Sequence, residues 1–231
     1  MRYKLFTCLM AIVTFDVMSG VKPVHTREVI GLDNEYKVDI VNTSDNKYLV
    51  QAWLEDLNGS KKNIPVVLTP PIFEIENYGT GLIRLLPITN SLPKDRESVF
   101  WLNTQEIPQK SKDQGVNRLQ MAVRTRIKIF LRPKQLSIQG LKEASSNLVW
   151  SKHDTYITAT NDSPYYLSMG ELMIETNNNS ERLPDRFDMV PPFSTQNYDL
   201  PELYQNKPIT IKHGVINDFG GINVIHETKF N

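Results

Sequence analysis

Few side chains in this chain have the types and spacing that enzymatic chemistry requires. The four histidines are widely separated and show no paired spacing that would bind zinc or copper: His25, His153, His213 and His226. Carboxylate pairs such as Glu74 with Glu76 have a spacing that, on a strand, is typical of a solvated face rather than of a catalytic pair. Nucleophile-elbow, phosphate-loop and dinucleotide motifs are missing from the sequence. We therefore expect no enzymatic activity, no cofactor and no metal.

The remaining chemistry is cationic and lies in one strand-like stretch, residues 118–133. Apolar side chains share one face of the predicted strand: Leu119, Met121 and Val123. Cationic side chains share the other: Arg124, Arg126 and Lys128. Such a strand is either half of an ordinary core or an edge that offers its apolar row to another chain and binds an anionic group with a cation.

Composition limits the classes of protein and of partner. The chain has 231 residues, 40% of them apolar and 23% charged, which is typical of a folded protein with two ordinary domains or one large all-β unit. Its 26 basic and 26 acidic residues give a formal net charge of zero, which argues against nucleic acid or an anionic membrane as the main partner. Any electrostatic function must be local.

The N-terminus has the pattern of a cleavable export signal. Arg2 and Lys4 precede an apolar run over residues 5–13, and a small-residue site before Gly20 predicts a signal peptide over residues 1–19. No later segment is long and apolar enough to predict stable membrane insertion. The only cysteine, Cys8, lies inside the signal, so the exported chain must fold by core burial without disulfides.

Short strand patterns separated by turn residues dominate the rest of the chain, which favours antiparallel sandwiches. The pattern weakens after Pro133 and a second series follows, so we expect a linker around residues 134–142. The predicted fold class is all-β, with one β-sandwich domain over residues 20–137 and a second over residues 138–231.

An ordered set of motifs in both halves resembles the periplasmic pilus (fimbrial) chaperones of the chaperone–usher pathway. The most specific is "SLPKDRESVFWLNTQEIP" at residues 91–108. Others are "YLVQAWLED" (48–56), "LTPP" (68–71), "RTRIKIFLRP" (124–133), "NDSPYY" (161–166), "MVPPFS" (189–194) and "INDFGG" (216–221). The resemblance implies two immunoglobulin-like sandwiches at an angle, with a cleft between them. The short segment between Glu106 and Leu119 is similar to the short-loop branch of the family.

The resemblance also implies roles for individual residues. Arg27 and Lys128 match the cations that bind the C-terminal carboxylate of a pilus subunit, and the row Leu119, Met121 and Val123 matches the strand lent to that subunit. From alternation alone, the row would pack into its own domain. Lys128 has the opposite strand parity to this row, so simple alternation puts it on the other face, and the sequence leaves open whether a bulge or strong twist turns it toward the cleft.

A second set of matching residues concerns the angle between the domains. Glu97, Arg132 and Asp218 match an ionic cluster that links the two domains in the family. Such a cluster adds little net stability but selects one arrangement, because an unpaired buried charge costs several kcal/mol. The alternative is three separate surface residues.

The sequence thus predicts a non-enzymatic periplasmic chaperone that completes the fold of pilus subunits by donor-strand complementation. It would deliver them to an outer-membrane usher, and its exposed edge would allow self-association when free. An exported two-domain immunoglobulin-like adhesin or ligand-binding protein is the alternative, and a copper/zinc sandwich enzyme is a weaker one. The sequence does not identify the subunit, the usher or the pilus.

Overall fold

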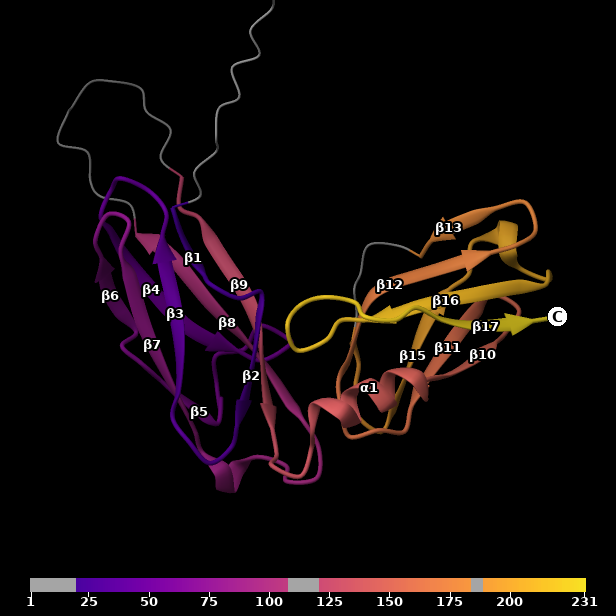
Figure 1. Ribbon diagram of the computed structural model, residues 1–231, viewed down its shortest axis with the longest axis horizontal. Coiled ribbons are helices and arrows are strands. Elements are labelled where there is room, and N and C mark those ends of the chain that lie inside the picture. The colour runs from indigo at the N-terminus through magenta and orange to yellow at the C-terminus, as the bar shows by residue number, and fades with distance from the viewer. Residues whose placement is uncertain (1–19, 108–120, 184–188) are drawn as a thin grey trace, which may run out of the picture.

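The protein consists of two β-sandwiches that are inclined to each other and joined through the segment that follows β9 (Figure 1). The structure is a computed structural model that describes residues 20–107, 121–183 and 189–231. Both sandwiches are built from short strands, and the one α-helix among the described residues lies at the junction. The prediction of an all-β fold with two sandwich domains is confirmed.

Two sheets form the N-terminal sandwich. The first has the order β1-β3-β7-β5: β1 (Val21–Pro23), β3 (Tyr36–Asn42), β7 (Thr80–Pro87) and β5 (Val66–Thr69). The second has the order β2-β9-β8-β4-β6: β2 (Arg27–Gly31), β9 (Arg124–Arg132), β8 (Ser98–Ile107), β4 (Tyr48–Glu55) and β6 (Ile72–Ile75). A short 3-10 helix, η1 (Thr89–Ser91), precedes β8.

The N-terminal core is aliphatic and lies between these sheets. Alternating residues such as Ile40 and Ile83 in one sheet are fully buried against residues such as Leu102 and Ile129 in the other. The N-terminal segment contributes to both sheets, because β1 pairs with β3 in the first and β2 pairs with β9 in the second. The β2–β9 pairing is parallel and places Arg27–Gly31 beside the last strand of the N-terminal sandwich.

The C-terminal sandwich also has two sheets. One has the order β10-β11-β15: β10 (Val149–Lys152), β11 (Tyr156–Asn161) and β15 (Ser194–Asp199). The other has the order β13-β12-β16-β17, with β14 also paired to β12: β13 (Ser180–Arg182), β12 (Leu167–Glu175), β16 (Ile209–Val215), β17 (His226–Phe230) and β14 (Met189–Val190). A 3-10 helix, η2 (Glu202–Tyr204), precedes β16.

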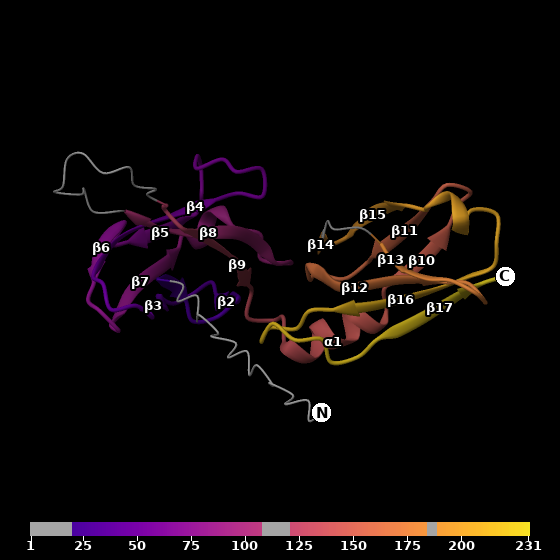
Figure 2. The ribbon, with the colours of Figure 1, turned by 90° about the horizontal axis from the view of Figure 1, so that it is seen from above.

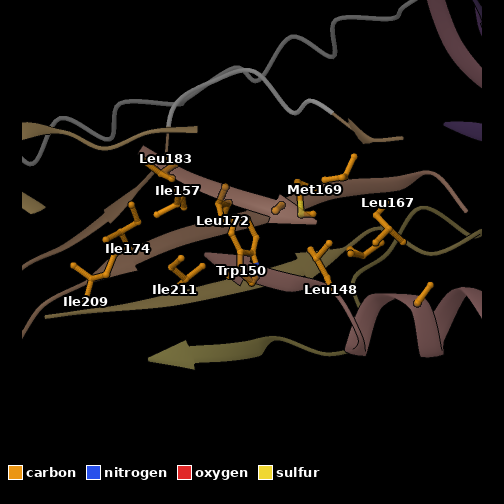
Figure 3. Close-up of a cluster of buried hydrophobic side chains, with 14 of the residues drawn as sticks. Leu148, Trp150, Ile157, Leu167, Met169, Leu172, Ile174, Leu183, Ile209 and Ile211 are labelled. Atoms are coloured by element: carbon orange, nitrogen blue, oxygen red, sulfur yellow. The ribbon is translucent and has the colours of Figure 1, made fainter. Parts of the chain in front are cut away.

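Figure 3 shows the C-terminal core, in which Trp150 lies among aliphatic side chains from both sheets, including Ile157, Leu172 and Ile211. Burying so large an aromatic side chain requires a partner for its indole N–H. His213 of β16 supplies it, because its Nδ1 accepts a hydrogen bond from Trp150 Nε1 at 3.1 Å.

A helix replaces part of the predicted linker. α1 (Ile138–Ser146) begins after Ser137, whose side chain accepts a hydrogen bond from the backbone N–H of Gly140. Leu141 and Ala144 lie on the face that packs onto the C-terminal core. The prediction of a linker around residues 134–142 is therefore wrong beyond Ser137, because a capped, amphipathic helix packs on the core of the second sandwich there.

Each sandwich contains the same Asn-x-Ser corner. Asn42 accepts hydrogen bonds from the backbone N–H and hydroxyl of Ser44 and donates to the carbonyls of Asn46 and Glu76. Asn161 likewise accepts hydrogen bonds from the backbone N–H and the hydroxyl of Ser163, and its side-chain amide donates to three nearby backbone carbonyls. Both asparagine side chains are buried. Each one therefore supplies hydrogen bonds to backbone groups that folding has removed from water and that would otherwise have no partner.

Figure 2 shows the segment between β16 and β17 extending from the C-terminal sandwich toward the N-terminal one. This segment supplies most of the contacts between the domains that are described below. Among the residues that the structure describes, no helix is long and apolar enough to cross a membrane.

Candidate functional site

The parallel pairing of β2 with β9 places two cations side by side. Arg27 is the first residue of β2 and lies directly opposite Lys128 of β9. Both belong to the face of the sheet that points away from the core, since their neighbours Glu28, Ile127 and Ile129 point to the other side and are buried. The sheet therefore presents two adjacent positive side chains toward the space between the domains.

Arg27 is held from two sides. Its guanidinium carbon lies 5.3 Å from the centroid of the Phe130 ring, and its Nη1 donates a hydrogen bond to the carbonyl of Ile216, 3.2 Å away in the C-terminal domain. Burial lowers the pKa of Arg27, while the carboxylates of Asp218 and Glu97 act in the opposite direction. An arginine nevertheless stays charged, so the cleft contains a partly desolvated cation whose other N–H groups can bind an anion.

Lys128 lies beside an aromatic platform. Its Nζ is 5.5 Å from the centroid of Trp101, which is directly opposite Lys128 in β8. The two residues line a cavity of about 300 Å³ together with side chains from the C-terminal domain, among them Tyr166 and Met189. Lys128 thus reaches the interdomain cleft.

No bulge turns Lys128 toward the cleft. The register of β9 is continuous with β8 from Arg124 to Leu131 and with β2 from Lys128 to Arg132. Simple alternation is sufficient, because the cleft lies on the face opposite to the core. Lys128 therefore lies on the face of β9 opposite to the buried Ile127 and Ile129.

The apolar row continues the core-facing side of β9 beyond the end of the sandwich. Met121 and Val123 have the same parity as the buried Ile127, yet 72% and 43% of their surface is exposed. Leu119 lies outside the described residues. Val123 is fixed by its carbonyl, which accepts a hydrogen bond from the backbone N–H of Glu106 at 3.1 Å. Met121 and Val123 are therefore not sealed inside their own domain.

The edge of β9 is open next to the cation pair. β2 pairs with β9 only from Lys128 onward, and in the described part of the chain no strand pairs with this edge over residues 124–127. An extended chain that filled this position would add a strand to the sheet and would end against the beginning of β2. Its terminus would then meet Arg27.

The predicted ionic cluster comes together at the junction of the domains. Arg132 Nε donates to Glu97 Oε1 at 2.6 Å, and its Nη1 and Nη2 donate to the two carboxylate oxygens of Asp218 at 2.6 and 2.7 Å. Glu97 also accepts a hydrogen bond from the backbone N–H of Tyr166 in the C-terminal domain, at 2.8 Å. Arg132 and Glu97 are almost fully buried, with 9% and 2% of their surface exposed.

Electrostatics couple the members of this cluster. Burial raises the pKa of Glu97, and Arg132 opposes that shift. Burial also acts to lower the pKa of Arg132, but the carboxylates of Asp218 and Glu97 together raise it. Each charge is therefore stabilised in the ionised form only by its partners, and removal of one would leave the others buried without compensation.

A tight turn delivers Asp218 to Arg132. The side-chain oxygen of Asn217 accepts hydrogen bonds from the backbone N–H groups of Phe219 and Gly221, which closes the turn. Gly220 has a φ of +87°, and a Cβ at this position would lie 2.7 Å from the hydroxyl of Thr26 in the N-terminal domain. Glycine is needed both for the backbone conformation and for this close approach.

Comparison with known proteins decides the family. The family model for pili and flagellar-assembly chaperones, PapD N-terminal domain, matches residues 20–137. The family model for the pili assembly chaperone PapD, C-terminal domain, matches residues 143–226. The chain belongs to the pilus-assembly chaperone family. It is a non-enzymatic chaperone that serves pilus assembly.

Individual relatives support this over most of the chain. The chaperone protein LpfB of Salmonella typhimurium is 32% identical over 226 residues, which is 95% of this chain and 94% of LpfB. The chaperone protein FimC of Escherichia coli K12 is 33% identical over 183 residues, or 78% of this chain and 71% of FimC. The crystal structure of the YadV chaperone has 31% identity and a TM-score of 0.77, over 92% of this chain and all of YadV.

Sequence reasoning missed several residues of the chaperone cleft. Trp101 and Phe130 hold the cations, and the carbonyl of Ile216 orients Arg27. Tyr166 and Met189 line the cleft from the C-terminal side. A strand register could have suggested Trp101, since it lies opposite Lys128, but no local pattern reveals which carbonyl of a distant loop Arg27 contacts.

Proposed function

We propose that this chaperone binds a pilus subunit by lending it the edge of β9, with Arg27 and Lys128 binding the terminal carboxylate of the subunit. The observation that carries the proposal is the position of the cation pair, which lies where the open edge of β9 meets the first residue of β2. Two cationic donors on one carboxylate form short charge-assisted hydrogen bonds and fix the register of the added strand.

The same geometry supports one direction for the added strand. Its C-terminus must lie at Arg27 and its preceding residues must lie beside residues 119–127, so it would run parallel to β9. Leu119, Met121 and Val123 would then point into the unfinished core of the subunit. This replaces the missing strand of the subunit and covers its apolar groove, which would otherwise aggregate.

The ionic cluster would maintain the cleft in which this happens. Glu97 and Arg132 come from the N-terminal domain and Asp218 from the C-terminal domain, so the cluster favours one angle between the sandwiches. The same turn that carries Asp218 contributes the Ile216 carbonyl to Arg27. The interdomain angle and the orientation of the anchor therefore depend on one segment.

Export and delivery complete the proposed function. Residues 1–19 would direct the chain to the periplasm and be removed. The chaperone would then pass its subunit to an outer-membrane usher without nucleotide, since the strand of the next subunit can replace the lent strand if it packs better. We also propose that the chain belongs to the short-loop branch, and that free molecules self-associate through the exposed Met121 and Val123.

The test is capture of pilus subunits coexpressed with the chaperone in the periplasm. Arg27→Ala and Lys128→Ala are each expected to lose more than tenfold of the co-purifying subunit while retaining the wild-type circular dichroism spectrum. Arg84→Ala is the matched control, because this exposed arginine lies in the opposite sheet and pairs only with Glu35 among the described residues. Capture at the wild-type yield by either anchor variant would refute the proposal.

Met121→Glu tests the donor row separately. A carboxylate placed in the apolar groove of a subunit would lose its water, so capture is expected to fall by at least tenfold while the free chaperone stays folded. The same variant should abolish any self-association measured by sedimentation. If instead substitutions in the loops abolish capture and Met121→Glu does not, binding occurs by a different surface.

A further inference from the structure

A pocket lies between the helix α1 and the segment that joins β16 to β17. Its volume is about 410 Å³, within the range of roughly 300–1,000 Å³ that is usual for small-molecule sites. Its apolar lining includes the buried Leu141 and Val215 together with three exposed side chains, Ile138, Phe219 and Val224. Phe219 has 86% of its surface exposed. A concave apolar surface of this kind is stabilised when an apolar group covers it.

Two side chains of this lining have polar atoms that are available to a ligand. Lys142 of α1 and His226 of β17 form no side-chain hydrogen bond or ion pair with any other described residue. The ring of His226 is held by stacking on His213, with 5.2 Å between the ring centroids. Glu143, the acidic residue of the lining, already accepts a hydrogen bond from Gln139 Nε2 at 3.1 Å. The available groups are N–H donors, which match the oxygens of a carboxylate.

One wall of the pocket is the turn that links the two domains. Asn217 and Phe219 line the pocket, and Asp218 between them binds Arg132 across the domain junction. The side chain of Asn217 holds this turn, because its Oδ1 accepts from the backbone N–H of Phe219 at 2.9 Å and its Nδ2 donates to Asn223 Oδ1 at 2.8 Å. A ligand that contacts the turn in this conformation therefore favours the arrangement in which Asp218 reaches Arg132.

We infer that this pocket binds a small amphipathic carboxylate, whose apolar group contacts Phe219 and whose carboxylate accepts hydrogen bonds from Lys142 and His226. A bound ligand stabilises the turn that carries Asp218, and with it one angle between the sandwiches. The chemistry of the lining carries the inference, because an apolar concavity with room for one ring has two unused donors on its walls. The inference is independent of the proposed anchoring of a pilus subunit.

The test uses phenylpropionate, which combines one ring with a carboxylate, and its neutral analogue phenylpropanamide. Binding to the isotope-labelled chain is followed by NMR titration, in which the shifts of backbone amide signals report both the location and the affinity of the probe. The variants are Lys142→Gln and Phe219→Ala, which change exposed side chains and should leave the fold intact. Lys207→Gln is the matched control, because it removes the same charge from an exposed position of the same domain outside the pocket.

Wild type should bind phenylpropionate with a Kd on the order of 0.1 mM and the amide about tenfold more weakly, as expected when one charge-assisted interaction is lost. Lys142→Gln should weaken binding of the acid by about tenfold and leave the amide unchanged. Phe219→Ala should weaken both probes equally, and Lys207→Gln should change neither. Equal binding of acid and amide by wild type, or equal effects of Lys142→Gln and Lys207→Gln, would overturn the inference. So would the absence of saturable shifts in the pocket at millimolar probe.

The link to the turn between the domains is tested with the neutral amide, because its affinity responds little to a change of charge nearby. Asp218→Asn weakens the contact with Arg132 and should reduce amide binding by about threefold, since the turn is then held less firmly in the conformation that binds. An unchanged amide affinity in Asp218→Asn would overturn this link. These titrations contain no pilus subunit, so their outcome is separate from that of subunit capture.

Discussion

The two sandwiches have similar architectures but differ in what they bury. All buried carboxylates among the described residues lie in the N-terminal sandwich: Glu28, Glu55, Glu97 and Glu106. Each has a partner, as Glu106 accepts from the backbone N–H of Val21 and Glu28 accepts from the hydroxyl of Tyr36. The C-terminal sandwich instead buries aromatic side chains and the neutral polar groups Ser145, Asn161, Ser168 and His213.

Under the proposed function, this difference agrees with the positions of the open edge and the cations. A sheet that offers an edge and a row of cations to a partner must hold those groups in place before the partner arrives. Buried carboxylates do this in the N-terminal sandwich, since Glu55 holds Arg124 and Glu97 holds Arg132. The C-terminal sandwich needs only to present its loops, and an apolar core with few buried polar groups is sufficient.

The largest expected effect comes from breaking the link between the domains. Arg132→Ala would leave Glu97 and Asp218 without their cation, and the loss of one partner of a buried pair costs about 3–5 kcal/mol. Urea unfolding should show the loss of stability, and small-angle scattering should show a broader range of domain angles. In contrast, Arg84→Ala removes an exposed pair and should change stability by less than about 1 kcal/mol. An equal effect of the two substitutions would contradict a special role for the cluster.

A second pair of substitutions compares the cores. Ile83 and Ile174 are fully buried at the centres of the N-terminal and C-terminal cores, and truncation of either to alanine should cost about 2–5 kcal/mol. Calorimetry should show that each substitution lowers the transition of its own sandwich. In a Trp53→Phe, Trp101→Phe background, the fluorescence of Trp150 should report the C-terminal transition only. If both substitutions shift one common transition equally, the sandwiches unfold as a single unit and the comparison fails.

The smallest expected effect is the dependence of the stability of the C-terminal sandwich on pH. Burial lowers the pKa of His213 from its ordinary value of 6.5, and the neighbouring His226, whose ring stacks on it at 5.2 Å, acts in the same direction. Its Nδ1 accepts from Trp150, and its Nε2 lies 3.2 Å from the carbonyl of Ser145 in α1. These contacts suit the neutral ring with its proton on Nε2.

The unfolded chain therefore binds a proton at His213 more readily than the folded chain does. The stabilisation is complete above pH 6.5 and is lost as pH falls below that value, by at most about 1.4 kcal/mol per pH unit for one proton. Urea unfolding of the C-terminal sandwich between pH 5 and pH 8 should show this slope. His213→Gln should flatten it, while the exposed His153→Gln should not; an unchanged slope in His213→Gln would exclude His213 as its source.

Much of the fold could be predicted from local pattern. Alternation in stretches such as Tyr36–Asn42 identified strands, because a half-buried strand must have an apolar face with a period of two. The helix α1 was missed, since its short apolar stripe resembles a weakened strand pattern. The Asn-x-Ser corners were also missed, because their hydrogen bonds go to carbonyls on other segments, such as Glu76 for Asn42.

By itself, the sequence determined the class of fold, the cationic strand and the set of motifs that place the chain in its family, because these properties are local to the chain. Only the tertiary structure decided that Arg27 lies opposite Lys128, since pairing between distant strands depends on how the sandwich closes. It also showed that Lys128 lies on the face of a regular β9 opposite to the buried side chains of that strand. A partner that adds at an edge meets both faces, so no bulge is required.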